Sequence, residues 1–366
     1  MPDLSNQLPP VNQLNPSDLA IPTSISRRTE EAEMNGKTFP STLEPSFLIE
    51  CIREWYHAQV VSLHRLPSDS EKYIYQVKLS SGAIWVLRVI EDASKATFVE
   101  LAHLLLFFEQ QHYPAERIVF TNEQTSIVNV SNWHLLMTTY LVGTPLEYVP
   151  PTFSLLGTAV GKLHALQSSL TYVPSPASML PSGELAFAQQ QLETIASRVP
   201  RPYIAQYELL ENALVSIDRG ASLPTTLIHN DCHPGNALLT APEQVILFDW
   251  EGAGMGSAAL DVGFLLVSCD GKAPWEPLST SAFHLDEKLL QAVIEGYCHY
   301  HQLTTDELNY LPDAIRFRSL VFGACSFASA IAHQESAEFS QWWWKRYCAA
   351  EEIADQARIS FEHLLQ

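Results

Sequence analysis

The sequence predicts an α+β protein of two lobes, with a strand-rich N-terminal part and a mainly helical C-terminal part. The chain of 366 residues is long enough to hold two lobes with a cleft between them. Short runs of β-branched and aromatic residues gather before residue 140, whereas longer apolar periodic runs follow it. Hydrophobic residues make up 46% of the chain, which is ample material for a core.

Residues 1–45 are rich in Pro, Ser, Asn and Thr and lack apolar periodicity, so we expect a disordered or loosely packed tail. The N-lobe is predicted to span residues 46–141. Its expected elements are a short helix, three strands, a longer helix and a two-stranded hairpin, at residues 47–59, 59–66, 72–79, 83–90, 95–112, 126–130 and 133–137.

The C-lobe, residues 142–366, is predicted to be mainly helical, with helices at residues 155–166, 184–198, 203–218, 286–300, 312–333 and 338–365. The run Trp342-Trp343-Trp344 is expected to pack in the core, because consecutive residues of a helix point in different directions and cannot form one cation-binding cage. Two interpretations of Arg316 and Arg318 are left open: they bind an acidic group of the substrate, or they lie at the surface.

Residues 227–254, LIHNDCHPGNALLTAPEQVILFDWEGAG, carry the clearest chemistry. They set His229, Asp231 and Asn236 in the spacing H-x-D-x-x-x-x-N, and an apolar run then leads to a second acid, Asp249. Phosphoryl transfer needs a carboxylate beside the attacking hydroxyl and hard oxygen ligands that hold Mg²⁺ against the phosphates. We therefore predict Asp231 as the catalytic base and Asn236 and Asp249 as Mg²⁺ ligands. A β-hairpin with solvated polar tips is the alternative interpretation.

Protein kinases carry H-R-D and D-F-G at the corresponding places. This chain has Asn230 in place of the Arg, and Asp249-Trp250-Glu251 in place of D-F-G. The segment thereby resembles the aminoglycoside phosphotransferase and choline kinase family, which phosphorylates small molecules on a protein-kinase-like fold. The resemblance implies an antiparallel-sheet N-lobe, a mainly helical C-lobe and ATP as the phosphate donor.

The resemblance also implies that the loop between the first two strands covers the ATP phosphates. That connection, residues 67–72, contains Ser68 and Ser70 but no glycine, which would allow the closest backbone approach. Ser68 and Ser70 are then the expected phosphate contacts. A plain hairpin turn is an equal interpretation of the same residues.

A cation for the phosphates is expected on the third strand, where Arg88 is flanked by apolar residues. A lone charge in a buried strand requires a partner, and the resemblance suggests a glutamate of the helix at residues 95–112. We predict Glu100 as that partner, because the rival Glu109 lies nearer the C-terminal end, where the helix dipole disfavours a carboxylate. A solvated Arg at the strand edge is the alternative.

Residues 137–143 resemble the hinge that holds adenine through backbone groups, with Thr139 and Leu141 as the expected contacts. The resemblance gives Asp261 the role of tying down the catalytic-loop backbone. We expect His229 to anchor the backbone of the metal-binding segment and His164 to be a buried, hydrogen-bonded histidine. Glu251 is open between binding a second metal or a substrate amine and being simply exposed.

The formal net charge of −20 argues against nucleic-acid binding, which requires clustered Lys and Arg. An acidic cleft would attract amines, but an acidic surface that keeps the protein soluble explains the charge more simply. The apolar stretches, such as residues 104–108 and 263–267, are too short to cross a membrane. The N-terminus has no signal-peptide pattern, and six scattered cysteines suit free thiols in a reducing cytoplasm.

These observations predict an ATP- and Mg²⁺-dependent phosphotransferase for a hydroxyl of a small molecule of aminoglycoside, amino alcohol, homoserine or sugar type. The alternatives are a kinase-like pseudoenzyme that binds nucleotide or metabolite and regulates a partner, and a protein Ser/Thr kinase. The glycine-free loop and Arg88 favour the pseudoenzyme, whereas Asp231, Asn236 and Asp249 favour catalysis. Oligomeric state is not predicted.

Overall fold

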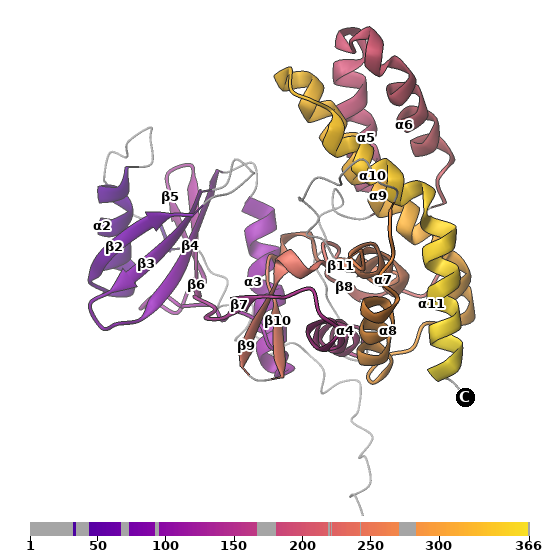
Figure 1. Ribbon diagram of the computed structural model, residues 1–366. Helices are drawn as coiled ribbons and strands as arrows, with labels where there is room; N and C mark the ends of the chain where they lie inside the picture. Colours follow the sequence, from indigo (N-terminus) through magenta and orange to yellow (C-terminus); the bar gives the residue numbers. More distant parts are fainter. Residues whose placement is uncertain are drawn as a thin grey trace, which may run out of the picture.

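Two lobes meet where the last long strand of the N-terminal sheet ends, as Figure 1 shows. The computed structural model describes residues 32–33, 44–66, 73–91, 95–166, 181–218, 220, 222–241, 243–270 and 283–364. The predicted phosphate loop with Ser68 and Ser70, and most of the predicted tail, lie outside these residues. The two-lobe α+β architecture agrees with the prediction.

The N-lobe is one sheet with the strand order β1-β5-β6-β4-β3-β2. Every neighbouring pair is antiparallel except β1 with β5. The strands are β1 (Ala32–Glu33), β2 (Val60–Arg65), β3 (Tyr73–Leu79), β4 (Ile84–Glu91), β5 (Ile127–Val130) and β6 (Trp133–Thr139). The three strands and the hairpin predicted from the sequence are thereby confirmed, with β1 added from within the predicted tail.

A helix covers each face of this sheet. On the outer face lies helix α2 (Pro45–Tyr56), whose Leu48 and Ile52 share one buried apolar cluster with Leu87 of the sheet. Helix α3 (Lys95–Gln110) lies between the sheet and the C-lobe (Figure 1), and its apolar side joins the C-lobe core. Because side chains alternate along a strand, Leu87 faces α2 while Arg88 faces α3 and the C-lobe.

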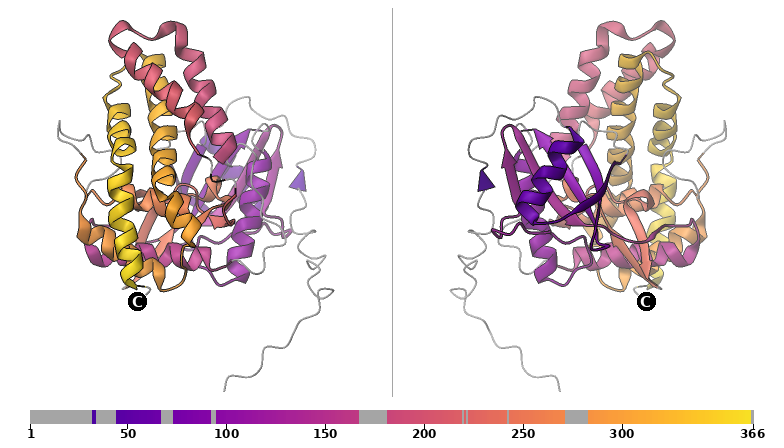
Figure 2. Two further views of the ribbon diagram at one scale, coloured as in Figure 1. Left: turned by 90° about the vertical axis from the view of Figure 1, so that its right-hand side faces the viewer. Right: turned by 90° about the vertical axis from the view of Figure 1, so that its left-hand side faces the viewer.

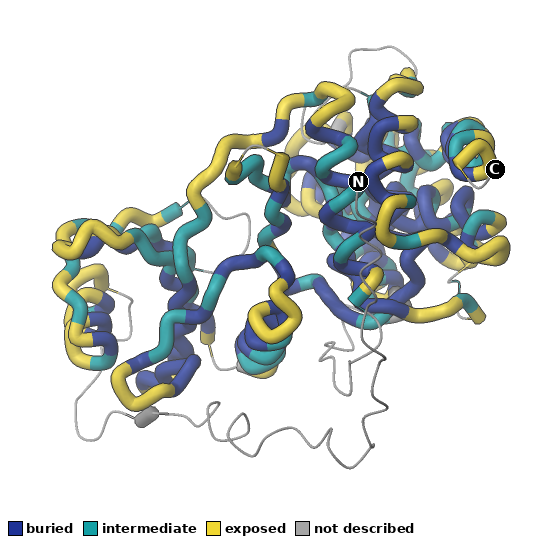
Figure 3. Tube along the Cα trace, turned by 90° about the horizontal axis from the view of Figure 1, so that it is seen from below, coloured by how far each residue is buried: buried dark blue, intermediate teal, exposed yellow. Residues whose placement is uncertain are grey.

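The C-lobe contains α4 (Pro150–His164), α5 (Pro181–Ile195), α6 (Ile204–Ser216), α7 (Ala258–Val267), α8 (Glu287–Cys298), α9 (Thr305–His333), α10 (Glu338–Cys348) and α11 (Ala350–Leu364). Helices α5 and α6 form a hairpin that projects from the rest of the lobe (Figures 1 and 2). Buried positions gather in the helices nearer the centre, as Figure 3 shows.

Helices α4 and α8 approach closely because small residues line their contact. A Cβ at Gly157 would lie 2.0 Å from the carbonyl oxygen of Val293, and one at Gly296 would lie 1.9 Å from that of Ser154. Since real Cβ atoms never come so near, both positions require glycine.

Two predicted helices have different limits in the structure. Helix α9 begins at Thr305 rather than at Pro312, because Thr304 and Glu307 form a capping box before it, and Pro312 lies inside the helix. The helix predicted at residues 338–365 is two helices, α10 and α11, separated at Ala349.

Helix α9 has 29 residues and is long and apolar enough to cross a bilayer by length and composition alone, unlike the short stretches noted in the sequence. However, 72% of its most apolar window is buried within the protein. Core helices of globular proteins commonly have this character. Trp342 and Trp343 of α10 are buried beside it, as the core-packing prediction requires.

Two small sheets carry the loops of the C-lobe. Strand β8 (Thr226–Ile228) pairs with β11 (Gly254–Gly256), and β9 (Ala237–Ala241) pairs with β10 (Gln244–Leu247) and β7 (Thr144–Pro145). The H-x-D-x-x-x-x-N segment connects β8 to β9, and Asp249 follows β10. Each polar segment therefore begins at the end of a short buried strand.

Candidate active site

The catalytic loop is held by a carboxylate from the first turn of α7. Asp261 accepts the backbone N–H groups of His229 at 2.7 Å and of Asn230 at 2.8 Å. Asn230 has the left-handed φ of 68°, a conformation that Asn tolerates better than most residues. The predicted role of Asp261 in fixing the loop backbone is confirmed by these contacts.

Asp261 belongs to a buried polar chain. Nε2 of His164 lies 3.1 Å from Oδ2 of Asp261, and Nδ1 of His164 lies 2.9 Å from the hydroxyl of Tyr297. Burial pushes the pKa of Asp261 upward, but the hydrogen bond and charge of His164, with the charge and backbone N–H of His229, hold it below its ordinary value. His164 is thus a buried, hydrogen-bonded histidine, as predicted.

The ring of His229 connects the catalytic loop to the metal-binding segment. Its Nε2 donates to the carbonyl of Phe248 at 3.0 Å, while its Nδ1 accepts the N–H of Asp231 at 3.3 Å. The N–H of Phe248 in turn donates to the carbonyl of Asn236 at 3.0 Å. These contacts confirm that His229 anchors the segment that carries Asp249.

Asp231 and Asn236 are in direct contact. Nδ2 of Asn236 donates to Oδ2 of Asp231 at 2.7 Å and to the Asp231 carbonyl at 3.0 Å. The other carboxylate oxygen of Asp231 lies 3.8 Å from Nε2 of His233. Burial lowers the pKa of His233, although the nearby Asp231 opposes this shift, so the neutral imidazole is favoured.

The side chains around Asp231 fit a hard cation. Because the amide nitrogen of Asn236 is bonded to Asp231, its Oδ1 is the atom left for a metal, and Asp249 adds a solvent-exposed carboxylate. Both are the oxygen ligands that Mg²⁺ prefers. Within the described ranges, no group of three or more His, Cys, Asp or Glu side chains forms a metal cage. Phosphate oxygens and water would complete such a site.

Asp231 and Asp249 open into one hollow of about 220 Å³. The other residues around it are Glu184, Asn230, Glu251, Gly252 and Phe322. Glu184 and Phe322 were not predicted as site residues, because α5 and α9 are distant in sequence from the catalytic segment and carry no motif. Their place at the hollow is a result of helix packing alone.

Arg88 belongs to the N-lobe and reaches Glu251, one of the residues around the hollow. Its Nη2 is 2.9 Å from Oε1 of Glu116, its Nη1 donates to Oγ1 of Thr138 at 2.9 Å, and its Nε is 3.9 Å from Oε1 of Glu251. Glu251 is 7% exposed, so the surface alternative for this residue is excluded. Arg88 thus connects the sheet to the segment of Asp249.

Comparison with known proteins decides the family. A family model described as "Phosphotransferase enzyme family" matches residues 62–309, which is more than half of the chain. The chain belongs to this phosphotransferase family. The resemblance to aminoglycoside phosphotransferases and choline kinases, and the protein-kinase-like fold, are thereby confirmed.

Solved structures support the fold across both lobes of this family member. An amicoumacin kinase has a TM-score of 0.64 at 16% identity, covering 92% of this chain and 96% of that chain. An aminoglycoside phosphotransferase from Alicyclobacillus acidocaldarius has a TM-score of 0.55 at 17% identity, over 89% and 97% of the two chains. A choline kinase from Streptococcus pneumoniae has a TM-score of 0.57 at 12% identity, over 85% and 98%.

A sequence relative is an uncharacterized protein of Deinococcus radiodurans, which is 28% identical over 194 residues. The match covers 50% of this chain. It spans about half of the length of that relative, 52%.

The partner predicted for Arg88 in this phosphotransferase was wrong. Glu116, and not Glu100, pairs with Arg88. After α3 the chain runs beside β6, where Ile118 bridges Thr138, and this brings Glu116 next to Arg88. Among the described residues, Oε2 of Glu100 has no hydrogen-bond partner, and burial raises the pKa of Glu100. Glu116 was not predicted from the sequence, because it lies beyond the end of the helix that was expected to supply the partner.

The predicted hinge of the phosphotransferase is the end of β6 and the residues after it. The N–H of Thr139 donates to the carbonyl of Arg117 at 2.8 Å, and the N–H of Arg117 donates to Oγ1 of Thr139 at 2.9 Å. The N–H of Arg117 is therefore bonded to the Thr139 hydroxyl, and not to the Thr139 carbonyl as in a regular strand pair. Leu141 is half-buried just beyond the strand.

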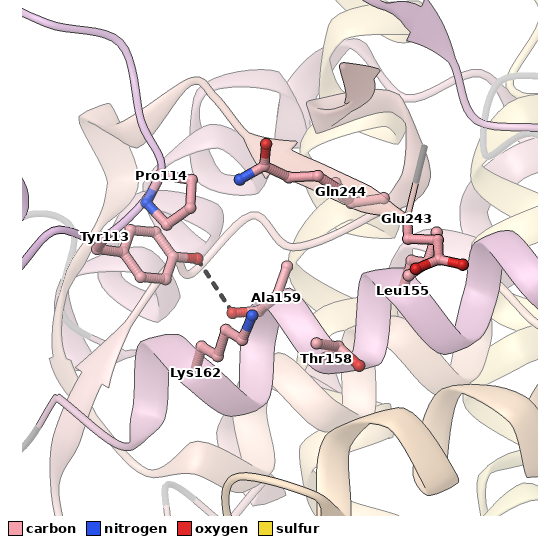
Figure 4. Close-up of a pocket in the computed structure, with 9 residues that line it drawn as sticks. Tyr113, Pro114, Leu155, Thr158, Ala159, Lys162, Glu243 and Gln244 are labelled. Carbon is pink, nitrogen blue, oxygen red and sulfur yellow. Dashed lines mark hydrogen bonds between the residues drawn. The ribbon is translucent and has the colours of Figure 1, made fainter. Parts of the chain in front are cut away.

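A second hollow lies apart from Asp231 and Asp249, between the chain after α3, helix α4 and the β9–β10 turn (Figure 4). The hydroxyl of Tyr113 donates to the carbonyl of Ala159 at 3.1 Å beside it. Its volume of about 30 Å³ suits ordered water rather than a substrate. The larger hollow is therefore the candidate substrate site.

Proposed function

We propose that this family member transfers the γ-phosphate of ATP to a hydroxyl group of a small molecule. The observation that carries the proposal is the convergence of Asp231, Asn236 and Asp249 beside one hollow. A carboxylate there accepts a proton, while a carboxamide oxygen and a second carboxylate bind a hard cation. A module that binds nucleotide without chemistry requires no base in addition to these ligands.

In the proposed reaction, the acceptor oxygen bonds to the γ-phosphorus as the bond from that phosphorus to the β–γ bridging oxygen breaks. ADP leaves with the bridging oxygen, and the hydroxyl proton passes to Asp231. Asn236 holds the Asp231 carboxylate by the 2.7 Å bond from its Nδ2. Asn236, through Oδ1, and Asp249 would hold Mg²⁺, which would neutralise charge on the phosphates.

The nucleotide is proposed to lie between the lobes. The Thr139 carbonyl, left without the Arg117 donor, and the backbone of Leu141 are the proposed adenine contacts. Arg88 is the proposed phosphate cation, held toward the C-lobe by Glu116. Ser68 and Ser70 remain the proposed phosphate contacts of the first loop.

The acceptor is proposed to occupy the hollow formed by α5, α9 and the catalytic loop. Aminoglycoside, amino alcohol, homoserine and sugar hydroxyls are the proposed classes, and the names of the structural neighbours support the first two. All six cysteines are free thiols in the structure, which supports the proposed cytoplasmic location.

The first experiment measures ADP release with Mg²⁺, ATP and pooled acceptors of these four classes. We expect pool-dependent ADP, and Asp231→Asn should lower kcat by about 10²–10⁴-fold because the general base is lost. Nucleotide affinity, measured by calorimetry, should be nearly unchanged in this variant. The exposed Glu352→Gln on α11 is the matched control and should keep full turnover.

Unchanged turnover in Asp231→Asn would reject Asp231 as the base. Clear nucleotide binding without ADP release from any pool would reject the small-molecule kinase, in favour of a regulatory pseudoenzyme or a protein kinase. Phosphate incorporation into added protein, measured in parallel, separates these two.

A further inference from the structure

One buried cation of the C-lobe has no part in the reaction proposed above. Arg318, on α9, is 1% exposed. Its Nη1 lies 2.8 Å from Oε1 of Glu184 on α5, and its Nη2 donates to Oδ1 of Asn230 in the catalytic loop. The guanidinium therefore joins two residues that lie at the wall of the hollow and belong to different elements.

Asn230 directly precedes the proposed base Asp231. The backbone N–H of Asn230 donates to Asp261, and its side-chain Oδ1 accepts from Arg318. The left-handed φ of 68° places the residue in a conformation that such anchors maintain. The position of Asp231 thus depends on contacts with both α7 and α9.

Glu184 is the second hydrogen-bond partner of Arg318, besides Asn230. It comes from the α5–α6 hairpin, faces the hollow together with Asp231, and has 15% of its side chain exposed. Its bond to Arg318 fixes the hairpin wall relative to the loop that holds the base. Both partners are bound by one rigid, planar group with two separate N–H donors, a geometry that Lys cannot reproduce.

We propose that Arg318 is a positioning residue that holds Asp231 and the α5 wall of the acceptor site in one fixed relation. This rests on the proposed phosphotransferase function. An acceptor seated against Glu184 would then have its hydroxyl at a set distance from Asp231. Loosening either contact of Arg318 should reduce turnover without changing nucleotide binding, because neither contact includes a proposed nucleotide contact or a proposed metal ligand.

The test uses the full chain and the acceptor found in the pooled assay. Asn230→Gly removes the acceptor of Arg318 while glycine keeps the left-handed backbone, and Arg318→Lys keeps the charge. We expect each to lower kcat by about ten- to a hundredfold, as misplacement of a reacting group does. The double variant should lose no more than the worse single variant, because both break one connection.

Glu184→Gln provides the second readout. The amide oxygen can still accept from Arg318, so Asp231 stays in place while the charge of the wall is lost. We expect a raised KM for the acceptor with kcat nearly unchanged, in contrast to Asn230→Gly. The matched control is Arg316→Lys, because Arg316 is on the same helix and pairs at the surface with Asp313 and Glu351.

Wild-type kcat in Asn230→Gly, or equal effects of Arg318→Lys and Arg316→Lys, would overturn the proposal. A lower melting temperature with normal kcat in these variants would show that the contact is merely structural, and would overturn it too. Absence of turnover in the wild-type chain is a different result, since it rejects the phosphotransferase function and with it the role of Arg318. In parallel, we expect the catalytic-loop amides to exchange hydrogen faster in Asn230→Gly than in the wild-type chain. Their exchange in Arg316→Lys should be unchanged.

Discussion

Arg88 and Glu116 form an ion pair with 2.9 Å between Nη2 and Oε1, in which both side chains are largely withdrawn from solvent. One residue comes from a central strand of the N-lobe and the other from the chain that follows α3. The pair ties the sheet to the region between the lobes. The sequence had suggested a pair between Arg88 and Glu100 of α3. In the structure Glu116 is the carboxylate that neutralises Arg88.

Replacing Glu116 should therefore cost much more stability than replacing Glu100. Glu116→Ala leaves Arg88 without its nearest carboxylate, and breaking a buried pair costs on the order of 3 kcal/mol. Glu100→Ala removes a half-buried carboxylate whose pKa is raised by burial, so the loss should be small. Urea denaturation of both variants measures the difference, and equal losses would contradict the assignment.

Asp249→Asn tests the proposed metal-ligand role of Asp249 without disturbing the backbone. Asp249 has a φ of 67°, which Asn tolerates and Ala would strain. Because the negative charge is lost, we expect nucleotide to bind more weakly in the presence of Mg²⁺ and equally well in its absence. Calorimetric titration of both conditions provides the measurement. A variant that retains the Mg²⁺-dependent gain in affinity would rule out Asp249 as a ligand.

Acid should destabilise the fold through two half-buried histidines, His103 and His301. Burial lowers the pKa of His103 and of His301 from the ordinary 6.5, and a neighbouring His164 lowers that of His301 further. As the pH falls through 6.5, the unfolded chain binds protons before the folded chain does, so the free energy of unfolding decreases. Above that pH the two states bind equally few protons and the contribution is constant.

Unfolding curves at pH 7.5 and 5.5 would check this pH dependence. The double variant His103→Gln/His301→Gln should lose less stability between these values than the wild-type chain. An identical loss in the two proteins would show that other groups are responsible. Asp261, whose folded pKa is depressed, adds a separate loss at lower pH, as the pH falls through its folded pKa.

The contact of α4 with α8 should not tolerate a methyl group. In Gly157→Ala the new Cβ would meet the Val293 carbonyl at 2.0 Å, so the helices must separate, at a cost of about 1–3 kcal/mol. Gly252→Ala is the control for stability, since its Cβ would find the nearest atom at 3.7 Å. Thermal unfolding of both variants measures the effect, and a stable Gly157→Ala protein would refute the close approach.

Local patterns predicted much of the fold. Short runs of β-branched, aromatic and other apolar residues indicated β3, β4 and β6. The H-x-D-x-x-x-x-N spacing with the following apolar strand indicated which residues, Asp231, Asn236 and Asp249, would lie together. These predictions depend on the chain within some twenty residues of the motif. The start of α9 was missed because a capping box before Thr305 outweighs the apparent signal of Pro312. The division at Ala349 was missed because the apolar periodicity continues across it.

The sequence by itself determined the family and the two-lobe fold of this protein, and it supplied the residues proposed as the base, the metal ligands and the cation on the third strand. Only the tertiary structure decided how those parts are held, since Glu116 rather than Glu100 meets Arg88, and Arg318 joins Glu184 to Asn230. The physical reason is that motif residues are neighbours along the chain. Their supporting partners are 28 to 134 positions away and are brought close by helix and sheet packing.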